Sequence, residues 1–427
     1  MRPTSRFQTV SFPFSQRYAR HSLALIGALS VAACADRGAP SPPGVVVESD
    51  SAGVRILETA APRFAAPAAP LMVDSAPQVV IGTEDSDDAY QLHRVSDATQ
   101  LADGRLVVAN AGSSELRVFD RDGRFLTQVG RAGSGPGEFA PFSSPRLYRS
   151  NDELLASDSE LSRLHAFDST LALRETRRFT ITPDIPRPQL QGILDDGTWL
   201  AIAFDGGGAL RGPPGSVIGT TFSLALYDGR GGFIRRFGSF AGRKRYVNTV
   251  GETTHYPHLP FTVDAVVRPY GRQILVFRGD RPEVELWSVE GKLETVIRWA
   301  RDRVRSVDLY PQYRAQAIAA LANAGERDRR LYGAFYEKEL PLPEFAALYD
   351  NVVIDDAHRI WLHRYRMPGE SGADQWDVID SAGPWLGTAT TPRGLEIFGI
   401  AADQIVGRMR DSLGVERIVL QSLRAAP

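Results

Sequence analysis

The chain has 427 residues, with 49 Lys and Arg against 51 Asp and Glu, which gives a formal net charge of −2. This near balance excludes a general nucleic-acid binder, whose phosphate contacts require a basic surface, so we expect no nucleic-acid partner. Hydrophobic residues make up 43% of the chain, enough for a packed core, and the length suits one large all-β domain or two ordinary ones.

The N-terminus has the parts of a secretory signal. Basic residues come first and no acidic residue lies among them: Arg2, Arg6, Arg17, Arg20 and His21. They are followed at 22–33 by the apolar or small-residue run "SLALIGALSVAA". This run is too short to span a bilayer, which takes about 20 residues of helix, and its length is typical of a cleaved leader. We therefore interpret residues 1–33 as a signal peptide.

Cys34 is the only cysteine in the chain and follows the apolar run directly. "Val31-Ala32-Ala33-Cys34" resembles the lipobox of bacterial lipoproteins. The resemblance implies cleavage before Cys34, acylation of that residue, and a membrane partner held through lipid. Ala35 in the next position favours the outer membrane, with the protein facing the periplasm. The alternative is an ordinary signal peptide with an incidental cysteine.

Residues 34–43 are rich in Pro and Gly and are predicted to be a tether between lipid and domain. The segment 44–92 then contains a hairpin, a connector and a spare strand. The hairpin is predicted in "VVVESDSAGVRILET", around Ser-Ala-Gly. An Ala/Pro-rich connector follows at 59–70, and "PQVVIG" at 77–82 is a strand ahead of the first repeat.

From residue 93 to 427 the chain repeats a pattern of short strands. One phrase is a strand that ends in an aromatic residue and an aspartate, then a turn and another strand, as in "ELRVFDRDGRFLTQVG" at 115 and "FSLALYDGRGGFIRRFG" at 222. A second phrase precedes it, as in "DGRLVVAN" at 103. Each unit supplies about four strands over roughly 40 to 60 residues, which is typical of a β-propeller blade. Six units are present, so we predict an all-β, six-bladed β-propeller.

The linker "VGRAGSGPGEFAPFSSP" at 129–145 resembles the connection between blades in NHL-type propellers. Several blade phrases also resemble that family, so the chain is similar to bacterial six-bladed β-propeller lipoproteins with NHL-like repeats. The resemblance implies that this stretch joins the outer strand of one blade to the inner strand of the next, with Phe139 as an anchor.

The last unit has room for only three strands, near 396–400, 404–409 and 416–422. A blade without its outer strand would expose an unpaired edge. We therefore predict that the strand at 77–82 completes the last blade and closes the ring.

One segment breaks the strand pattern, at 306–345. Leu309, Tyr313, Ala317 and Leu321 fall on one helical face, Pro311 suits a first turn and Gly325 a helix stop. We predict a helical hairpin inserted between blades four and five, capping one face of the ring.

In a propeller the first strand of every blade lines a central channel. We expect these strands to begin near Val95, Pro145, Leu190, Val263, Asn351 and Leu395. Polar residues expected there are Arg94, Asp97, Arg146, Gln191, Asp264, Asn351 and Glu396. Gluconolactonase-type hydrolases, which are six-bladed propellers, hold a divalent cation at this place. The resemblance implies a metal site formed by Asp264, Asn351 and Glu396, whose oxygens suit a hard cation. The alternative is that these side chains line a wet channel, and no other cofactor is expected.

A second candidate site lies in the loop near 239–260. Arg243, Lys244 and Arg245 form a basic run that suits an anionic ligand or partner. "His255-Tyr-Pro-His258" has the spacing of a metal clip, but Pro257 forbids a helix interior and no further Cys or His is nearby. A solvated surface loop is the alternative for both features.

Two functions remain open on the sequence. The first is a membrane-anchored, exported propeller that acts as a binding or scaffold module for a protein, peptide or glycan, which would not be an enzyme. The second is a metal-dependent hydrolase or lyase with its site at the channel mouth. Fold alone does not choose between them, because propellers host both.

Overall fold

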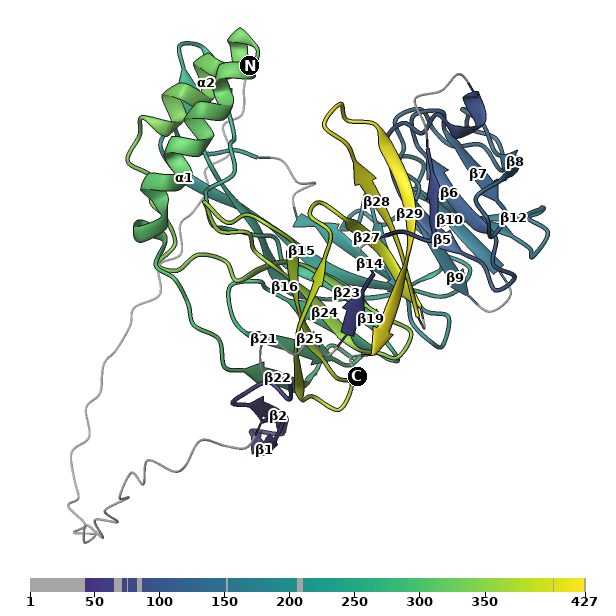
Figure 1. The fold of residues 1–427 in the computed structure, drawn as a ribbon, viewed down its shortest axis with the longest axis horizontal. Coiled ribbons are helices and arrows are strands. Elements are labelled where there is room, and N and C mark those ends of the chain that lie inside the picture. The colour runs from purple at the N-terminus through teal and green to yellow at the C-terminus, as the bar shows by residue number, and fades with distance from the viewer. Residues whose placement is uncertain are drawn as a thin grey trace, which may run out of the picture. The chain divides into compact units, whose positions relative to one another are not determined.

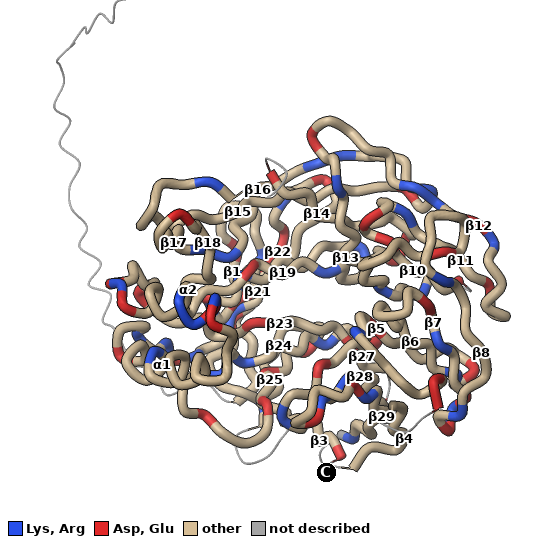
Figure 2. Tube along the Cα trace, turned by 90° about the horizontal axis from the view of Figure 1, so that it is seen from above, with Lys and Arg blue, Asp and Glu red and all other residues tan. Residues whose placement is uncertain are grey.

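In the computed structural model, the described residues are 43–64, 71–74, 76–82, 87–150, 153–205, 210–401 and 403–425. Over these residues the chain forms six antiparallel blades arranged around a centre (Figures 1 and 2). Each blade has four strand positions, and in blade six the outer position is shared by two short strands. The predicted fold, a six-bladed all-β propeller, is confirmed.

The first three blades follow one another along the chain, each running from its inner to its outer strand. Blade one comprises β5 (Val95–Gln100), β6 (Leu106–Asn110), β7 (Glu115–Phe119) and β8 (Phe125–Val129). Blade two comprises β9 (Leu147–Ser150), β10 (Glu153–Asp158), β11 (Arg163–Phe167) and β12 (Leu173–Arg178). Blade three comprises β13 (Gln189–Ile193), β14 (Trp199–Phe204), β15 (Val217–Tyr227) and β16 (Phe233–Tyr246).

Blades four and five also consist of consecutive strands, whereas blade six combines C-terminal strands with strands from the N-terminal segment. Blade four comprises β19 (Val266–Tyr270), β20 (Gln273–Phe277), β21 (Glu283–Trp287) and β22 (Leu293–Trp299). Blade five comprises β23 (Tyr349–Ile354), β24 (Ile360–Arg364), β25 (Asp374–Ile379) and β26 (Trp385–Thr391). Blade six comprises β27 (Glu396–Ala401), β28 (Gln404–Arg410), β29 (Glu416–Ala425), and the N-terminal strands β3 (Leu71–Val73) and β4 (Val79–Ile81).

The inner strands form a closed circle. Each contacts the next in the order β5, β9, β13, β19, β23, β27 and back to β5. Figure 2 shows these strands around the centre of the ring. The side chains of six blades therefore meet in one channel, which positions the candidate site.

The ring closes where the sequence predicts. β4 pairs antiparallel with β29, with Val80 opposite Val419, and β3 pairs with the end of the same strand. Ile81 is completely buried, between blade six and blade one. The last blade thus receives its outer strand from the N-terminal segment; the participation of β3 was not expected.

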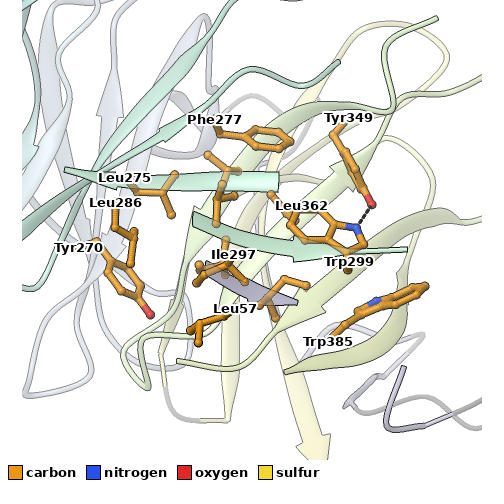
Figure 3. Close-up of a cluster of buried hydrophobic side chains, with 14 of the residues drawn as sticks. Leu57, Tyr270, Leu275, Phe277, Leu286, Ile297, Trp299, Tyr349, Leu362 and Trp385 are labelled. Atoms are coloured by element: carbon orange, nitrogen blue, oxygen red, sulfur yellow. Dashed lines mark hydrogen bonds between the residues drawn. The ribbon is translucent and has the colours of Figure 1, made fainter. Parts of the chain in front are cut away.

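The predicted N-terminal hairpin is also present, as β1 (Val46–Ser51) and β2 (Val54–Thr59). Its position was not predicted: β2 pairs parallel with β22, so the hairpin extends blade four beyond its outer strand. Leu57 packs into the cluster between blades four and five (Figure 3). There Trp299 Nε1 donates to the Tyr349 hydroxyl at 2.7 Å, and that hydroxyl donates to Asp377 Oδ2 at 2.6 Å.

The recurring aspartates are turn residues. Asp120 Oδ1, for example, accepts from the backbone N–H groups of Asp122 and Arg124. Equivalent contacts are made by Asp168, Asp228 and Asp380. These side chains close tight turns between strands, which explains their recurrence without any catalytic role.

The link from blade one to blade two is fixed by a buried aromatic residue. Phe139 is fully buried between the two blades. Gly130 has φ +84°, and a Cβ there would lie 2.7 Å from the Phe139 ring. His165 also holds the link: one ring nitrogen lies 2.9 Å from the Glu138 carbonyl oxygen, and the other accepts from Gly137 N–H at 3.3 Å. Glycine is therefore required at 130, both for backbone freedom and for space.

The helical hairpin lies between blades four and five, as predicted. It comprises α1 (Ser306–Ala320), the 3₁₀ turn η3 (Leu321–Asn323) and α2 (Glu326–Tyr336). Two details of the prediction were wrong. Pro311 lies inside α1 rather than in its first turn, and Gly325 is the N-cap of α2, with φ −64°, rather than a left-handed stop.

The hairpin has its own small core, which we call the insert core. It contains Tyr246, Leu259, Phe335, Tyr336 and Leu340, with Tyr313 packed against them. Its neighbours are β17 (Asn248–Val250) and β18 (Thr253–His255). Figure 2 shows α1 and α2 at the rim of the ring rather than over its centre, so they do not cap the channel.

The predictions on the signal peptide, Cys34 and the tether up to residue 42 fall outside the described residues and stay predictions. In the described part of the chain, no helix combines the length and hydrophobicity that membrane crossing requires.

Candidate functional site

A cavity of about 880 Å³ occupies the centre of the ring. Residues from all six inner strands line it, including Asp97, Tyr148, Gln191, Arg268 and Asn351. Its volume lies in the range of small-molecule pockets, about 300 to 1,000 Å³. The cavity is therefore large enough to hold a small ligand or the end of a chain.

The three residues of the predicted cation site do not come together. Asn351 and Glu396 line the cavity, but Asp264 is not part of its lining. Asp264 instead accepts from the backbone N–H of Arg243, and its Oδ2 lies 3.4 Å from Arg243 Nε. Glu396 is ion-paired with Arg408, and Asn351 Oδ1 accepts from Val352 N–H at 2.9 Å. Across the described ranges, no three His, Cys, Asp or Glu side chains gather in a metal-binding arrangement.

The reason is the start of one strand. The sequence places the inner strand of blade four from about Val263, whereas β19 begins at Val266. Asp264 therefore lies in the preceding loop. Arg268 occupies the position in the cavity lining that the prediction gave to Asp264.

The basic run of the second candidate site lies at the end of β16, and its members differ in exposure. Lys244 is exposed, whereas Arg243 is half-buried and binds Asp264. Arg245 is half-buried and donates to the Tyr256 carbonyl at 3.0 Å. The segment that includes His258 runs antiparallel to this end of β16 and fixes it. Only part of the predicted cationic cluster therefore faces solvent.

The two histidines have different surroundings. His255 Nε2 lies 2.7 Å from Asn248 Nδ2, and its ring packs edge-on against Tyr332 of α2. His258 is largely exposed, and partial burial lowers its pKa, with a smaller contribution from the nearby Arg245 and Arg243. Burial also lowers the pKa of His255. That His255 and His258 bind a ligand stays a prediction. The described contacts of His255 give it a structural role between β18 and α2.

Asp97 and Arg146 line the cavity, as the sequence predicts, and Arg268, which the sequence did not single out, joins them at the level of the third residues of β5, β19 and β23. Arg146 Nε lies 3.3 Å from Asp97 Oδ2, and Asp97 also accepts from the backbone N–H groups of Leu147 and Ala98, each at 2.9 Å. Arg268 faces the same cavity, and its only described hydrogen bond is from Nη1 to the Val267 carbonyl at 2.9 Å.

The electrostatics of this cluster follow from its depth. Burial, and then the neighbouring Arg146, lower the pKa of Arg268 to about 10. Burial raises the pKa of Asp97, although Arg146 opposes that effect. Burial also raises the pKa of Tyr148, which therefore stays a neutral phenol at physiological pH; its hydroxyl donates to the Leu190 carbonyl at 3.0 Å. The cluster thus joins two arginines to one ionisable carboxyl group.

Comparison with known proteins agrees with this architecture. A family model described as a 6-bladed beta-propeller matches residues 81–189, which span blades one and two. No curated protein matches the chain.

Several solved structures are similar over most of the chain. A predicted exported protein from Bacteroides fragilis has a TM-score of 0.48 and 13% identity, covering 87% of this chain and 100% of that one. A member of the duf4221 family from Bacteroides vulgatus has a TM-score of 0.46 and 11% identity, covering 84% and 99%. The virginiamycin B lyase of Staphylococcus aureus has a TM-score of 0.37 and 9% identity, covering 83% and 99%. At such low identity we transfer no ligand or activity from them.

Proposed function

We propose that the chain is an exported, lipid-anchored β-propeller that acts as a binding module and engages a protein or peptide through its helical insertion. The observation that carries this is a set of exposed apolar side chains on the α1–α2 hairpin. Val307 is 52% exposed, Ile318 41% and Tyr332 36%. The apolar character favours a protein or peptide over a glycan as the ligand.

The hairpin is held firmly enough to serve as a recognition element. Phe335 and Leu331 are almost completely buried, and Asn248 Nδ2 donates to the Leu331 carbonyl at 3.1 Å. Val307 and Ile318 are 11 residues apart, about three helical turns, so they lie on the same side of α1. One side of the hairpin is therefore fixed by the insert core while apolar groups remain exposed to a partner.

Lipid anchoring supports the same proposal. Acyl chains on Cys34 would hold the propeller at a membrane, since each buried CH₂ contributes about 0.8 kcal/mol, and the segment 34–43 would give it reach. The outer membrane, with the domain in the periplasm, is the location that Ala35 favours. No observation favours the metal-dependent alternative, because Asp264 and Glu396 each bind an arginine instead of converging.

The experiment is site-specific photo-crosslinking in the native host. A photoreactive residue at Ile318 should yield a discrete adduct, while the same residue at Leu126, which is 50% exposed on β8, should not. Adding Val307→Glu to the Ile318 probe should reduce the adduct at least about tenfold, since a charge in an apolar contact costs well over 1.4 kcal/mol. Equal crosslinking from both positions, or none from Ile318, would contradict the proposed surface.

The anchor has a separate test. Cys34→Ser should move the protein from the membrane fraction to the soluble fraction after export. If the variant still sediments with membranes, the lipid attachment is wrong, whatever the crosslinking shows.

A further inference from the structure

We propose that Arg146 and Arg268 form an oxyanion-binding site inside the central cavity, which takes a carboxylate or phosphate group of a small ligand. The site lies within the ring and does not depend on the function proposed for the helical insertion. We call these two residues and Asp97 the channel cluster.

The first argument is the missing counter-charge at Arg268. Among the described residues no carboxylate lies within ion-pair distance of its guanidinium group. The charged or ionisable groups that act on it are Arg146, Tyr148 and Asp97. Tyr148 is neutral, and Asp97 lies against Arg146. Arg268 is partly buried, and the side chain of Arg146 is 48% exposed. Two neighbouring cations repel each other in the free protein, and an anion placed between them would relieve that repulsion.

The second argument is that the other acidic side chains of the cavity are already engaged. Glu396 binds Arg408, Asp158 binds Arg163 and Asp355 binds Arg359. Asp356 is engaged as well. Asp355 and Asp356 also follow the end of β23, four and five residues beyond Asn351. None of these groups is left to neutralise Arg268.

The third argument is the chemistry of the lining. Guanidinium groups bind carboxylates and phosphates through two parallel N–H donors, which gives them geometric specificity. Arg268 uses one described hydrogen bond, so most of its five donors remain available. Gln191 and Arg149 also line the cavity, and both carry N–H donors that suit the polar body of a ligand. The ligand expected is therefore anionic, small enough for about 880 Å³, and polar.

The experiment measures binding to the purified protein. Inorganic phosphate and succinate serve as probes of the two oxyanion classes, each titrated by calorimetry and by thermal unfolding against sodium chloride of equal ionic strength. At least one should bind saturably and raise the melting temperature. Protection by phosphate alone indicates a phosphate-bearing ligand, and protection by succinate alone a carboxylate. Protection by neither would overturn the proposal.

The variants separate recognition from general charge. Arg268→Met should weaken binding about 30-fold or more, as expected when one partner of a buried charged contact is removed. Arg268→Lys should bind the oxyanion with intermediate affinity, because lysine keeps the positive charge but lacks the two parallel N–H donors of a guanidinium group. Arg235→Met, an exposed arginine on β16, should bind like the unaltered protein.

Stability without ligand gives an independent readout. Because Arg268 lacks a counter-ion, Arg268→Met should melt at the same temperature as the parent or higher when no oxyanion is present. If Arg268→Met fails to fold or melts lower while Arg268→Lys behaves normally, the residue is structural and the proposal fails. Ile318→Glu should leave oxyanion binding unchanged, so failure of one proposal does not affect the other.

Discussion

The ring is interrupted at two boundaries, and N-terminal strands seal both of them differently. Between blades six and one the strand repeat is not continuous along the chain, and β4 fills the place of a missing strand by pairing with β29. Between blades four and five the chain leaves for the helical insertion, and β2 joins the outside of a sheet that already has four strands. β4 therefore completes blade six, whereas β2 covers the outer edge of blade four.

The difference between the two boundaries predicts that they contribute unequally to folding. Removal of β4 would leave the outer edge of β29 unpaired at Ile418–Leu420 and would open the completely buried position of Ile81. Removal of β1 and β2 would leave blade four with its own hydrogen bonds and would uncover only the side that Leu57 seals. We therefore expect the first boundary to be required for folding and the second to reinforce it.

Truncation should give the largest effect. A chain that begins at residue 71 keeps β3 and β4 and should fold as a monomer with reduced stability. A chain that begins at residue 83 should aggregate, because it exposes the edge of β29 and the core beneath it. Circular dichroism and size-exclusion chromatography measure the difference. Two truncations of equal stability would refute the distinction.

The second-largest effect is expected where Trp299, Tyr349 and Asp377 are joined by hydrogen bonds at the boundary between blades four and five. Tyr349→Phe should lower the free energy of unfolding by about 1 to 3 kcal/mol, because Trp299 Nε1 and Asp377 both lose a buried partner (Figure 3). Tyr227→Phe is the matched control, since the buried Tyr227 hydroxyl has no partner among the described residues. Denaturant unfolding should show little or no loss for the control.

The boundary between blades one and two, which the chain crosses without interruption, should make the stability of the protein depend on pH. Burial lowers the pKa of His165, which links blade two to the Glu138 carbonyl. The pKa of His165 is lower in the folded state than in the unfolded state. Its contribution to the free energy of unfolding is therefore complete above about pH 6.5 and is lost as the pH falls below that value. The slope from one proton is at most about 1.4 kcal/mol per pH unit. His165→Gln should have a shallower slope below pH 6.5; identical slopes would rule out this assignment.

The smallest effect is expected on the outside of the appended hairpin. Arg55 and Glu48 form an ion pair at 2.7 Å in which both side chains are more than half exposed. Glu48→Gln should leave the melting temperature unchanged, because water and salt screen such a pair. A clear drop in melting temperature would show that the hairpin surface does more than cover an edge.

The sequence predicted the parts of the fold that depend on local chemistry. Aspartates in turns mark the ends of strands, and the shortened sixth unit pointed to the closing strand at 77–82. The position of β2 on blade four was not predictable, because a parallel pairing across more than 200 residues leaves no local pattern. The candidate site was harder still. A three-residue error at the start of β19 brought Asp264 into the expected channel and left out Arg268.

The role of β29 has a consequence for the order of events in the cell. Synthesis runs from the N-terminus, so the first strands of this ring emerge long before the strand they need. β3 and β4 must wait for residues 416–425, near the end of the chain. A nascent chain of this protein therefore remains open until residues 416–425 have been synthesised. That delay suits a polypeptide that crosses a membrane before it folds.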